Sequence, residues 1–299
     1  MSWIESLNQY LTAQQPLGSL WLFRTFFGTA CLIKCWVEIQ RGFLVAYQPT
    51  TWLYFRLRAI HPNRRERLPG KTVYIIAHGL RIGAAFGLTT GYLPRLCAAV
   101  LVVVFLAETR LYFRFHVNYF LLLSAALLFA PPMPTLVQTA SKLPGGVGHT
   151  WEYLQLASGP RVSLILIAIT TTALYMGSAR RKVSRVFLDG TVVWSQLSYT
   201  HSQQPLRHHF DGWYPRSLPN LLDKVRPGHP VWWTAMGLVV LLEATLPILL
   251  LWPETRATAI TLGLLMHAGF VLLSPLTLLP FGIATTAAYL AFPVIRLAG

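Results

Sequence analysis

The chain has 299 residues, of which 54% are hydrophobic and only 12% are charged, and its mean hydropathy is +0.48. A soluble domain carries about a quarter charged residues, so this composition argues against a soluble enzyme and a disordered chain and favours a protein embedded in a bilayer. Lys and Arg number 25 against 10 Asp and Glu, a net charge of +15. In a membrane protein such an excess records orientation and contact with anionic lipid, and we expect no nucleic-acid partner.

The apolar segments predict an all-α, polytopic membrane bundle. Segment 2–13 places its apolar side chains on one helical face, which predicts an interfacial helix that ends before Pro16. This N-terminal region lacks the features of a cleavable signal peptide, so we expect the first apolar segment to remain as a membrane helix. We expect a single domain over 1–299, with an extramembrane or interfacial segment at 183–229. Eight apolar spans follow, near the length that a hydrocarbon core of about 30 Å requires: roughly 18–37, 72–91, 93–109, 116–131, 161–178, 231–252, 257–274 and 276–295.

Basic residues predict the orientation of these spans. Two basic segments, 41–71 and 180–226, lie between spans, and with eight spans both fall on the side that carries Arg110 and Arg114. The positive-inside rule then places these segments in the cytoplasm and both termini outside. Separately from this orientation, we expect the protein to be integral to a bacterial inner membrane.

Ionisable side chains inside apolar spans are candidates for function, because they are costly to bury in lipid. Lys34 and Glu38 are four residues apart and can pair on one helix face, which favours a structural interpretation. His78 and Arg81 share a face of the next span, where structural and functional interpretations both stay open.

The segment 105–120 is a charged, aromatic junction between two spans. It contains Glu108, Tyr112, His116 and Tyr119. A loop would explain its charges, but it does not explain the aromatic content, so we favour the lining of a site. Later in the chain Glu243 lies in the middle of a span, where a carboxyl group must be protonated or paired with a buried base. His267 also lies mid-span and needs a polar partner.

The order of these features resembles the horizontally transferred transmembrane (HTTM) domain family, the membrane part of vitamin K-dependent γ-glutamyl carboxylase and its bacterial relatives. Residues 108–132 match the family's acidic residue, aromatic-Asn-His stretch and Leu-rich span ending in Pro, and 175–190 match its Gly-x-x-Lys-like turn followed by an aromatic residue and an acidic-Gly pair. Glu243 and His267 match a later carboxylate and a single His in order and spacing. The family often has Asn three residues after that His, where this chain has Phe270. The match covers roughly residues 15–295.

The resemblance implies that Lys182 corresponds to the essential base of the carboxylase, with Phe187 and Asp189 in the motif that follows. A lysine at the end of a membrane helix is desolvated, and nearby arginines disfavour its ammonium form. Lys182 could therefore act as a base, or give up its proton as an acid. The alternative is a basic helix end that lipid phosphate neutralises.

An apolar substrate fits this chemistry, because the chain has 16 Phe, 12 Tyr and 10 Trp and aromatic faces stabilise carbocations. We expect a terpene or meroterpenoid cyclase acting on an isoprenoid, with Glu243, Glu108 or Asp189 as the protonating acid. The sequence given carries no soluble domain like that of the carboxylase, which favours a lipid-sized substrate. The expected catalytic residues are Lys182, Glu243, His267, Glu108, His116 and Asp189, and the expected substrate-binding residues are His78, Arg81, Tyr112, Tyr119, Tyr175 and Phe187.

Other functions stay open. One alternative is a quinone-dependent carboxylase-like lyase or epoxidase with reduced quinone as cofactor, and another is a membrane factor for maturation of a secreted peptide toxin. A non-catalytic scaffold or transporter is the third. We expect no metal, because the adjacent histidines His208 and His209 with Asp211 form only a weak chelate in a polar loop.

Overall fold

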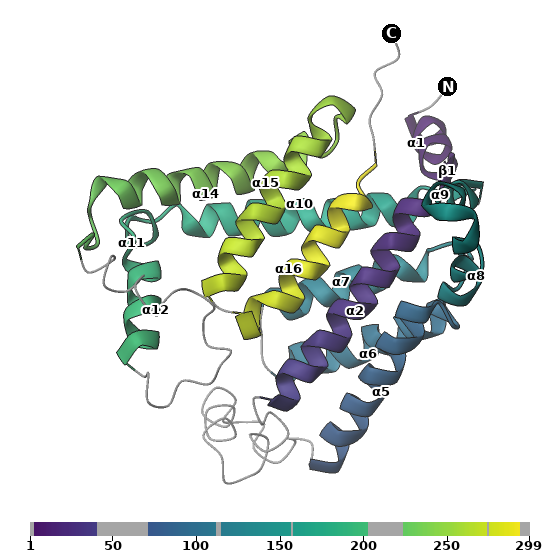
Figure 1. Ribbon diagram of the computed structural model, residues 1–299, viewed down its shortest axis with the longest axis horizontal. Coiled ribbons are helices and arrows are strands. Elements are labelled where there is room, and N and C mark those ends of the chain that lie inside the picture. The colour runs from purple at the N-terminus through teal and green to yellow at the C-terminus, as the bar shows by residue number, and fades with distance from the viewer. Residues whose placement is uncertain are drawn as a thin grey trace. The chain divides into compact units, whose positions relative to one another are not determined.

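The computed structural model describes residues 3–40, 71–111, 115–156, 158–202, 224–273 and 275–293, which are almost entirely helical (Figure 1). The all-α prediction is therefore confirmed for this part of the chain, apart from one pair of three-residue strands. The chain divides into two compact units, residues 1–167 and 168–299. Helix α10 (Val162–Lys182) begins in the first unit and continues in the second.

The first unit is built around four apolar helices in which α5 packs on α2, α6 on α5, and α7 on α6. Phe27 of α2 joins them, since its ring lies 5.5 Å from those of Phe23 and Phe120. Phe105 of α6 packs on the Phe120 ring at 5.6 Å. The elements of this unit before α10 are α1 (Trp3–Thr12), β1 (Gln14–Pro16), α2 (Gly18–Gln40), α5 (Lys71–Thr90), α6 (Pro94–Leu111), α7 (Phe115–Leu128), α8 (Leu136–Ala140), the 3-10 helix η2 (Leu143–Gly145), α9 (Gly146–Leu156) and β2 (Ser158–Pro160).

The two strands fix one end of the first unit. They pair antiparallel, with Gln14 opposite Pro160 and Pro16 opposite Ser158. Helix α2 starts directly after β1, and α10 starts directly after β2. The pairing therefore brings the beginnings of these two helices to the same end of the unit.

Within the described residues, the second unit contains the remainder of α10 and five further helices, with α15 packed on both α14 and α16. Its core gathers Tyr175, Leu246, Met266, Tyr289 and Phe292 from α10, α14, α15, α16 and the residues after α16. The helices are α11 (Arg185–Leu188), α12 (Thr191–Ser202), α14 (Pro230–Leu249), α15 (Pro253–Leu273) and α16 (Pro275–Leu290).

Five described helices, α2, α5, α10, α14 and α15, are long and apolar enough to cross a membrane. Large apolar side chains such as Phe86, Val103 and Leu265 are more than half exposed, as a lipid-facing surface requires. These features are compatible with an integral membrane protein. The eight predicted spans each coincide with a helix, but α6, α7 and α16 are not among the five, so the number of crossings stays a prediction.

Candidate functional site

Several of the predicted site residues gather in two clusters, one in each unit. The first, which we call the charge cluster, comprises Lys34, Glu38, Arg81 and Glu108. The second, which we call the aromatic site, comprises Tyr175, Lys182, Glu243, His267 and Tyr289.

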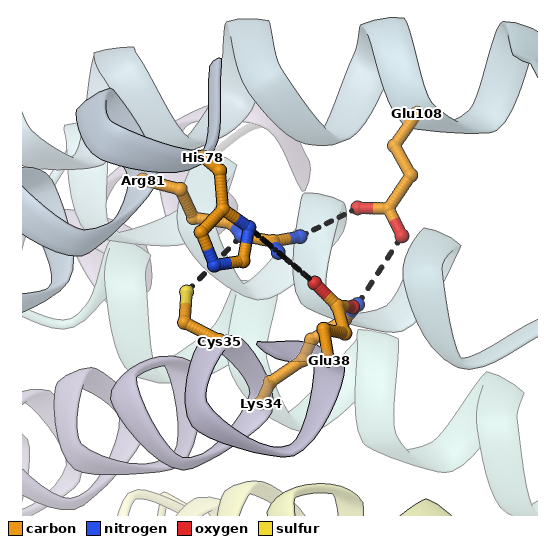
Figure 2. Close-up of polar contacts among 6 residues, drawn as sticks. All are labelled: Lys34, Cys35, Glu38, His78, Arg81 and Glu108. Atoms are coloured by element: carbon orange, nitrogen blue, oxygen red, sulfur yellow. Dashed lines mark hydrogen bonds and ion pairs between the residues drawn. The ribbon is translucent and has the colours of Figure 1, made fainter. Parts of the chain in front are cut away.

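The charge cluster joins α2, α5 and α6 through alternating charges (Figure 2). Lys34 contacts the Glu38 carboxylate, and its Nζ lies 3.2 Å from Glu108 Oε1. Arg81 also contacts Glu38, and its Nη1 lies 3.0 Å from Glu108 Oε2. Each carboxylate therefore meets both cations, and the four charges cancel.

Arg81 also fixes the protonation pattern of His78. Its Nε donates to Cys35 Sγ at 3.2 Å, and its Nη2 lies 2.9 Å from His78 Nδ1. A guanidinium group can only donate, so His78 Nδ1 must be the acceptor and the imidazole proton lies on Nε2. That Nε2 is buried and has no hydrogen-bond partner in the described part of the chain.

This arrangement gives the charge cluster a structural role first. The Lys34–Glu38 pair is present, as the spacing of four residues predicts. The contacts of this pair with Arg81 and Glu108, and that between Arg81 and Glu108, join residues 27 to 74 positions apart, so no local sequence pattern predicts them. Removing one member of such a buried network leaves an uncompensated charge, which is strongly destabilising. Because both Glu108 oxygens face cations, this carboxyl group is a poor proton donor.

The aromatic site centres on a lysine–glutamate pair. Lys182 Nζ, at the C-terminal end of α10, lies 2.5 Å from Glu243 Oε1 of α14. The Ser178 hydroxyl, one turn earlier on α10, donates to the same oxygen at 3.2 Å. Glu243 is only 3% exposed, and its other oxygen, Oε2, is buried without a partner among the described residues. The buried carboxyl group of Glu243 therefore has one hydrogen-bonded oxygen, Oε1, and one oxygen, Oε2, without a described partner.

Two phenyl rings cover the amine of this pair. Lys182 Nζ lies 4.7 Å from the centre of the Phe270 ring and 5.5 Å from that of Phe187. Both distances allow cation–π attraction. Phe270 also meets the His267 ring edge-on at 6.0 Å, so one aromatic side chain touches both basic groups. Phe270 stands where the HTTM family often has Asn.

A chain of hydroxyl groups continues from His267. Its Nε2 lies 2.7 Å from the Tyr175 hydroxyl, which in turn contacts the hydroxyl of Tyr289 on α16. Phe281 closes another side of the imidazole at 5.9 Å. Such a chain can hold or pass a proton by shifting its hydrogen bonds. Sequence reasoning missed Tyr289, because it lies 114 positions from Tyr175 and belongs to no motif.

Asp189 lies outside the contacts that define the aromatic site and caps a helix end instead. It is the C-cap of α11, and its Oδ1 accepts the Thr191 backbone N–H at 2.9 Å. Hydrogen bonds from the Thr191 side chain and backbone lower the pKa of the Asp189 carboxyl group. Asp189 is therefore ionised at neutral pH, which makes it a poorer acid than the prediction required.

The remaining predicted residues are placed only in part. Tyr119 is buried in α7 of the first unit. His116 lies in the first turn of α7, but its side chain lies outside the described residues, as do Tyr112, His208, His209 and Asp211. Among the residues described, no group of three or more His, Cys, Asp or Glu side chains is arranged to hold a metal ion.

No family model, curated protein or solved structure matches the chain. The relation to the HTTM family therefore stays a prediction from the order of its motifs. The geometry of the aromatic site is the independent basis for a functional proposal.

Proposed function

We propose that the protein is an integral membrane enzyme of the HTTM type, with eight membrane crossings in a bacterial inner membrane, that carries out acid/base chemistry on an apolar isoprenoid. Its reaction is that of a terpene or meroterpenoid cyclase. The observation that carries the proposal is the Glu243 carboxyl group, which is held through Oε1 by Lys182 and buried with Oε2 open. That open oxygen is the atom that would meet the substrate.

Acid-initiated cyclisation needs only one proton donor and one acceptor. Glu243 gives a proton to an alkene carbon or an epoxide oxygen, so that the π bond or a C–O bond breaks and leaves a carbocation. New carbon–carbon bonds close the rings, and loss of a proton to a base ends the reaction. The product is an isomer of the substrate, and neither an oxidant nor a second substrate is consumed.

Lys182 prepares Glu243 for this role. Its Nζ contacts Glu243 Oε1 and is the nearest described donor to that oxygen, closer than the Ser178 hydroxyl at 3.2 Å. A proton moved from Lys182 to Glu243 across their 2.5 Å contact therefore arms the acid. The His267–Tyr175 pair is the candidate acceptor of the final proton, with Tyr289 extending its hydrogen bonds.

Phe270 and Phe187 fit the same cycle. Their faces hold the Lys182 ammonium in the resting state. Once that amine is neutral, the same faces are available to a carbocation on the substrate, which they stabilise by cation–π attraction. The same two phenyl rings thus stabilise the Lys182 ammonium before the reaction and the substrate carbocation during it.

A carboxylase-like reaction on a reduced quinone is the second candidate. It is favoured by the exposure of Lys182, whose side chain is 22% exposed while that of its partner Glu243 is 4% exposed. An accessible amine beside a buried carboxylate could remove a phenolic proton. This reaction would depend on added reduced quinone, whereas cyclisation would not.

The proposal is tested with purified protein in detergent and farnesyl- or geranylgeranyl-derived alkenes and epoxides. We expect the wild type to form a cyclic isomer, and Glu243→Gln to lose about a hundredfold or more in turnover, the usual share of a general acid. Glu254→Gln is the matched control, because Glu254 is an exposed glutamate in the first turn of α15. Turnover by Glu243→Gln at the wild-type rate, or no conversion by the wild type, contradicts the proposal.

A further inference from the structure

Arg24 is a fully buried cation without a carboxylate partner among the described residues. It lies in the second turn of α2, and its Nη2 donates to the Pro134 carbonyl oxygen at 3.0 Å. The Trp21 indole donates to the same oxygen at 2.9 Å. The remaining Arg24 groups, Nε and Nη1, are buried and find no acceptor in the described chain. The guanidinium group therefore has one carbonyl partner and no neutralising charge there.

Three segments hold this guanidinium group in place. Besides the Pro134 loop and the Trp21 ring, whose centre lies 5.9 Å from Arg24 Cζ, the turn at Gly91 presses on it. Gly91 has φ +83°, and a Cβ atom there would lie 2.7 Å from Arg24 Nη2. The close approach and the left-handed backbone both require glycine. Arg24 is thus positioned rigidly rather than left free to reach water.

Further donors without partners lie at the same end of the first unit. Arg161 Nε and Ser163 Oγ, just after β2, are buried and unpaired within the described residues. The strand pairing brings Arg161 and the start of α10, which contains Ser163, to the end where α2 starts. Arg81, which is also buried, differs from Arg24 because it meets two carboxylates. This end of the unit carries positive charge that the described protein groups do not neutralise.

A buried charge is stable only when it is paired, and guanidinium N–H groups match the oxygens of carboxylate and phosphate. We propose that Arg24 binds an anionic oxygen group, a phosphate ester or a carboxylate, at this end of the first unit. A lipid headgroup and a soluble anion share this chemistry. The site does not depend on the proposed cyclisation, since it uses none of the residues of the aromatic site.

Two arms of one experiment distinguish the sources. Thermal unfolding of the full chain is followed in detergent with and without inorganic phosphate, and in nanodiscs of phosphatidylcholine with and without phosphatidylglycerol. We expect the unfolding temperature to rise with at least one probe. A rise with phosphate alone identifies a soluble anion, a rise with phosphatidylglycerol alone identifies a lipid headgroup, and a rise with both identifies a site for either. No rise with either probe overturns the proposal.

Variants assign the effect to Arg24. Arg24→Gln keeps a donor for Pro134 but loses the charge, and we expect the active probe to bind about tenfold more weakly or worse, as loss of a charged hydrogen bond implies. Arg95→Gln is the control, because Arg95 is exposed, lies near the same turn and donates to the Ala130 carbonyl at 2.9 Å. Equal responses of Arg24→Gln and wild type overturn the proposal. If Arg24→Gln does not fold, two other measurements test the proposal. The first is binding of the active probe by Arg24→Lys, and unweakened binding contradicts the proposal. The second is mass measurement of the anion retained by the wild type, and the absence of a retained anion contradicts it as well.

Discussion

Two buried glutamates differ in what surrounds them, and this difference sets their chemistry. Glu108 has a cation at each oxygen, from Lys34 and Arg81. Glu243 has one cation at one oxygen and an open, buried second oxygen, counting the described residues as partners. Protein cations therefore occupy both oxygens of Glu108, whereas one oxygen of Glu243 stays available to a substrate. Of the three predicted acids, Glu243 is therefore the best suited to protonate a substrate.

The charge cluster predicts strong coupling between its members. Arg81→Met leaves Lys34 alone against Glu38 and Glu108, and we expect a loss of about 3–5 kcal/mol in the free energy of unfolding. Adding Glu38→Gln restores the charge balance, so the double variant should be more stable than the sum of the single effects predicts. Chemical unfolding in detergent measures all three variants. Additive losses would mean that the charges do not interact.

The hydroxyl chain of the aromatic site makes an ordered prediction about two tyrosines. Tyr175→Phe removes the hydroxyl that meets both His267 and Tyr289, so it should destabilise the protein more than Tyr289→Phe, which removes the contact with Tyr175, worth about 1 kcal/mol. Tyr92→Phe is the control, because this side chain is 65% exposed. Thermal unfolding gives the order, and the account fails here if Tyr289→Phe is the more damaging change.

At the scale of elements, the turn at Gly190 couples α11 and α12 to α14. Gly190 has φ +83°, and a Cβ atom there would lie 2.3 Å from atoms of the Trp232 ring. The Trp232 indole is itself held by the Val225 carbonyl at 2.8 Å. The ring therefore cannot move aside easily, and the turn requires glycine for space as well as for backbone conformation.

Gly190→Ala should cost more than backbone strain alone. We expect a loss of about 2–4 kcal/mol, the sum of left-handed strain and overpacking. Gly228→Ala separates the two causes, because Gly228 has φ +91° but open space where its Cβ would lie. It should lose only about 1–2 kcal/mol. Equal losses in the two variants, measured by thermal unfolding, would show that the contact with Trp232 contributes nothing.

The sequence predicted the positions of the helices more completely than the side-chain contacts between them. Each of the eight apolar runs coincides with a helix in the described part of the chain, because burial in lipid demands continuous hydrophobic segments. Spacing along one helix also predicted the Lys34–Glu38 pair. Lys182 and Glu243 were each predicted as candidate residues, but their contact across 61 positions was not, and Tyr289 had no signal at all. The short strands β1 and β2 also escaped prediction, because three residues give no measurable alternation.

For the whole molecule, the basic excess predicts a topology that labelling can test. Single cysteines replace Tyr92, Thr109 and Ser141 in a Cys97→Ser background, and an impermeant maleimide is added to intact cells. With eight crossings we expect positions 92 and 141 to react from outside and position 109 to react only after the membrane is opened. Position 109 is decisive, because it lies in the last turn of α6, the helix that precedes α7, and neither α6 nor α7 is among the five long, apolar helices. External labelling of all three positions would remove two crossings.

The source of the first proton tests the central claim most directly. The reaction is run in D2O with purified protein and a geranylgeranyl-derived substrate, and mass spectrometry measures the deuterium content of the product. If Glu243, after exchange with solvent, protonates a substrate carbon, the cyclic product carries one deuterium, Glu243→Gln forms no such product, and Glu254→Gln forms it normally. A cyclic product without deuterium from an alkene substrate, or labelled product from Glu243→Gln at the wild-type rate, would contradict the account.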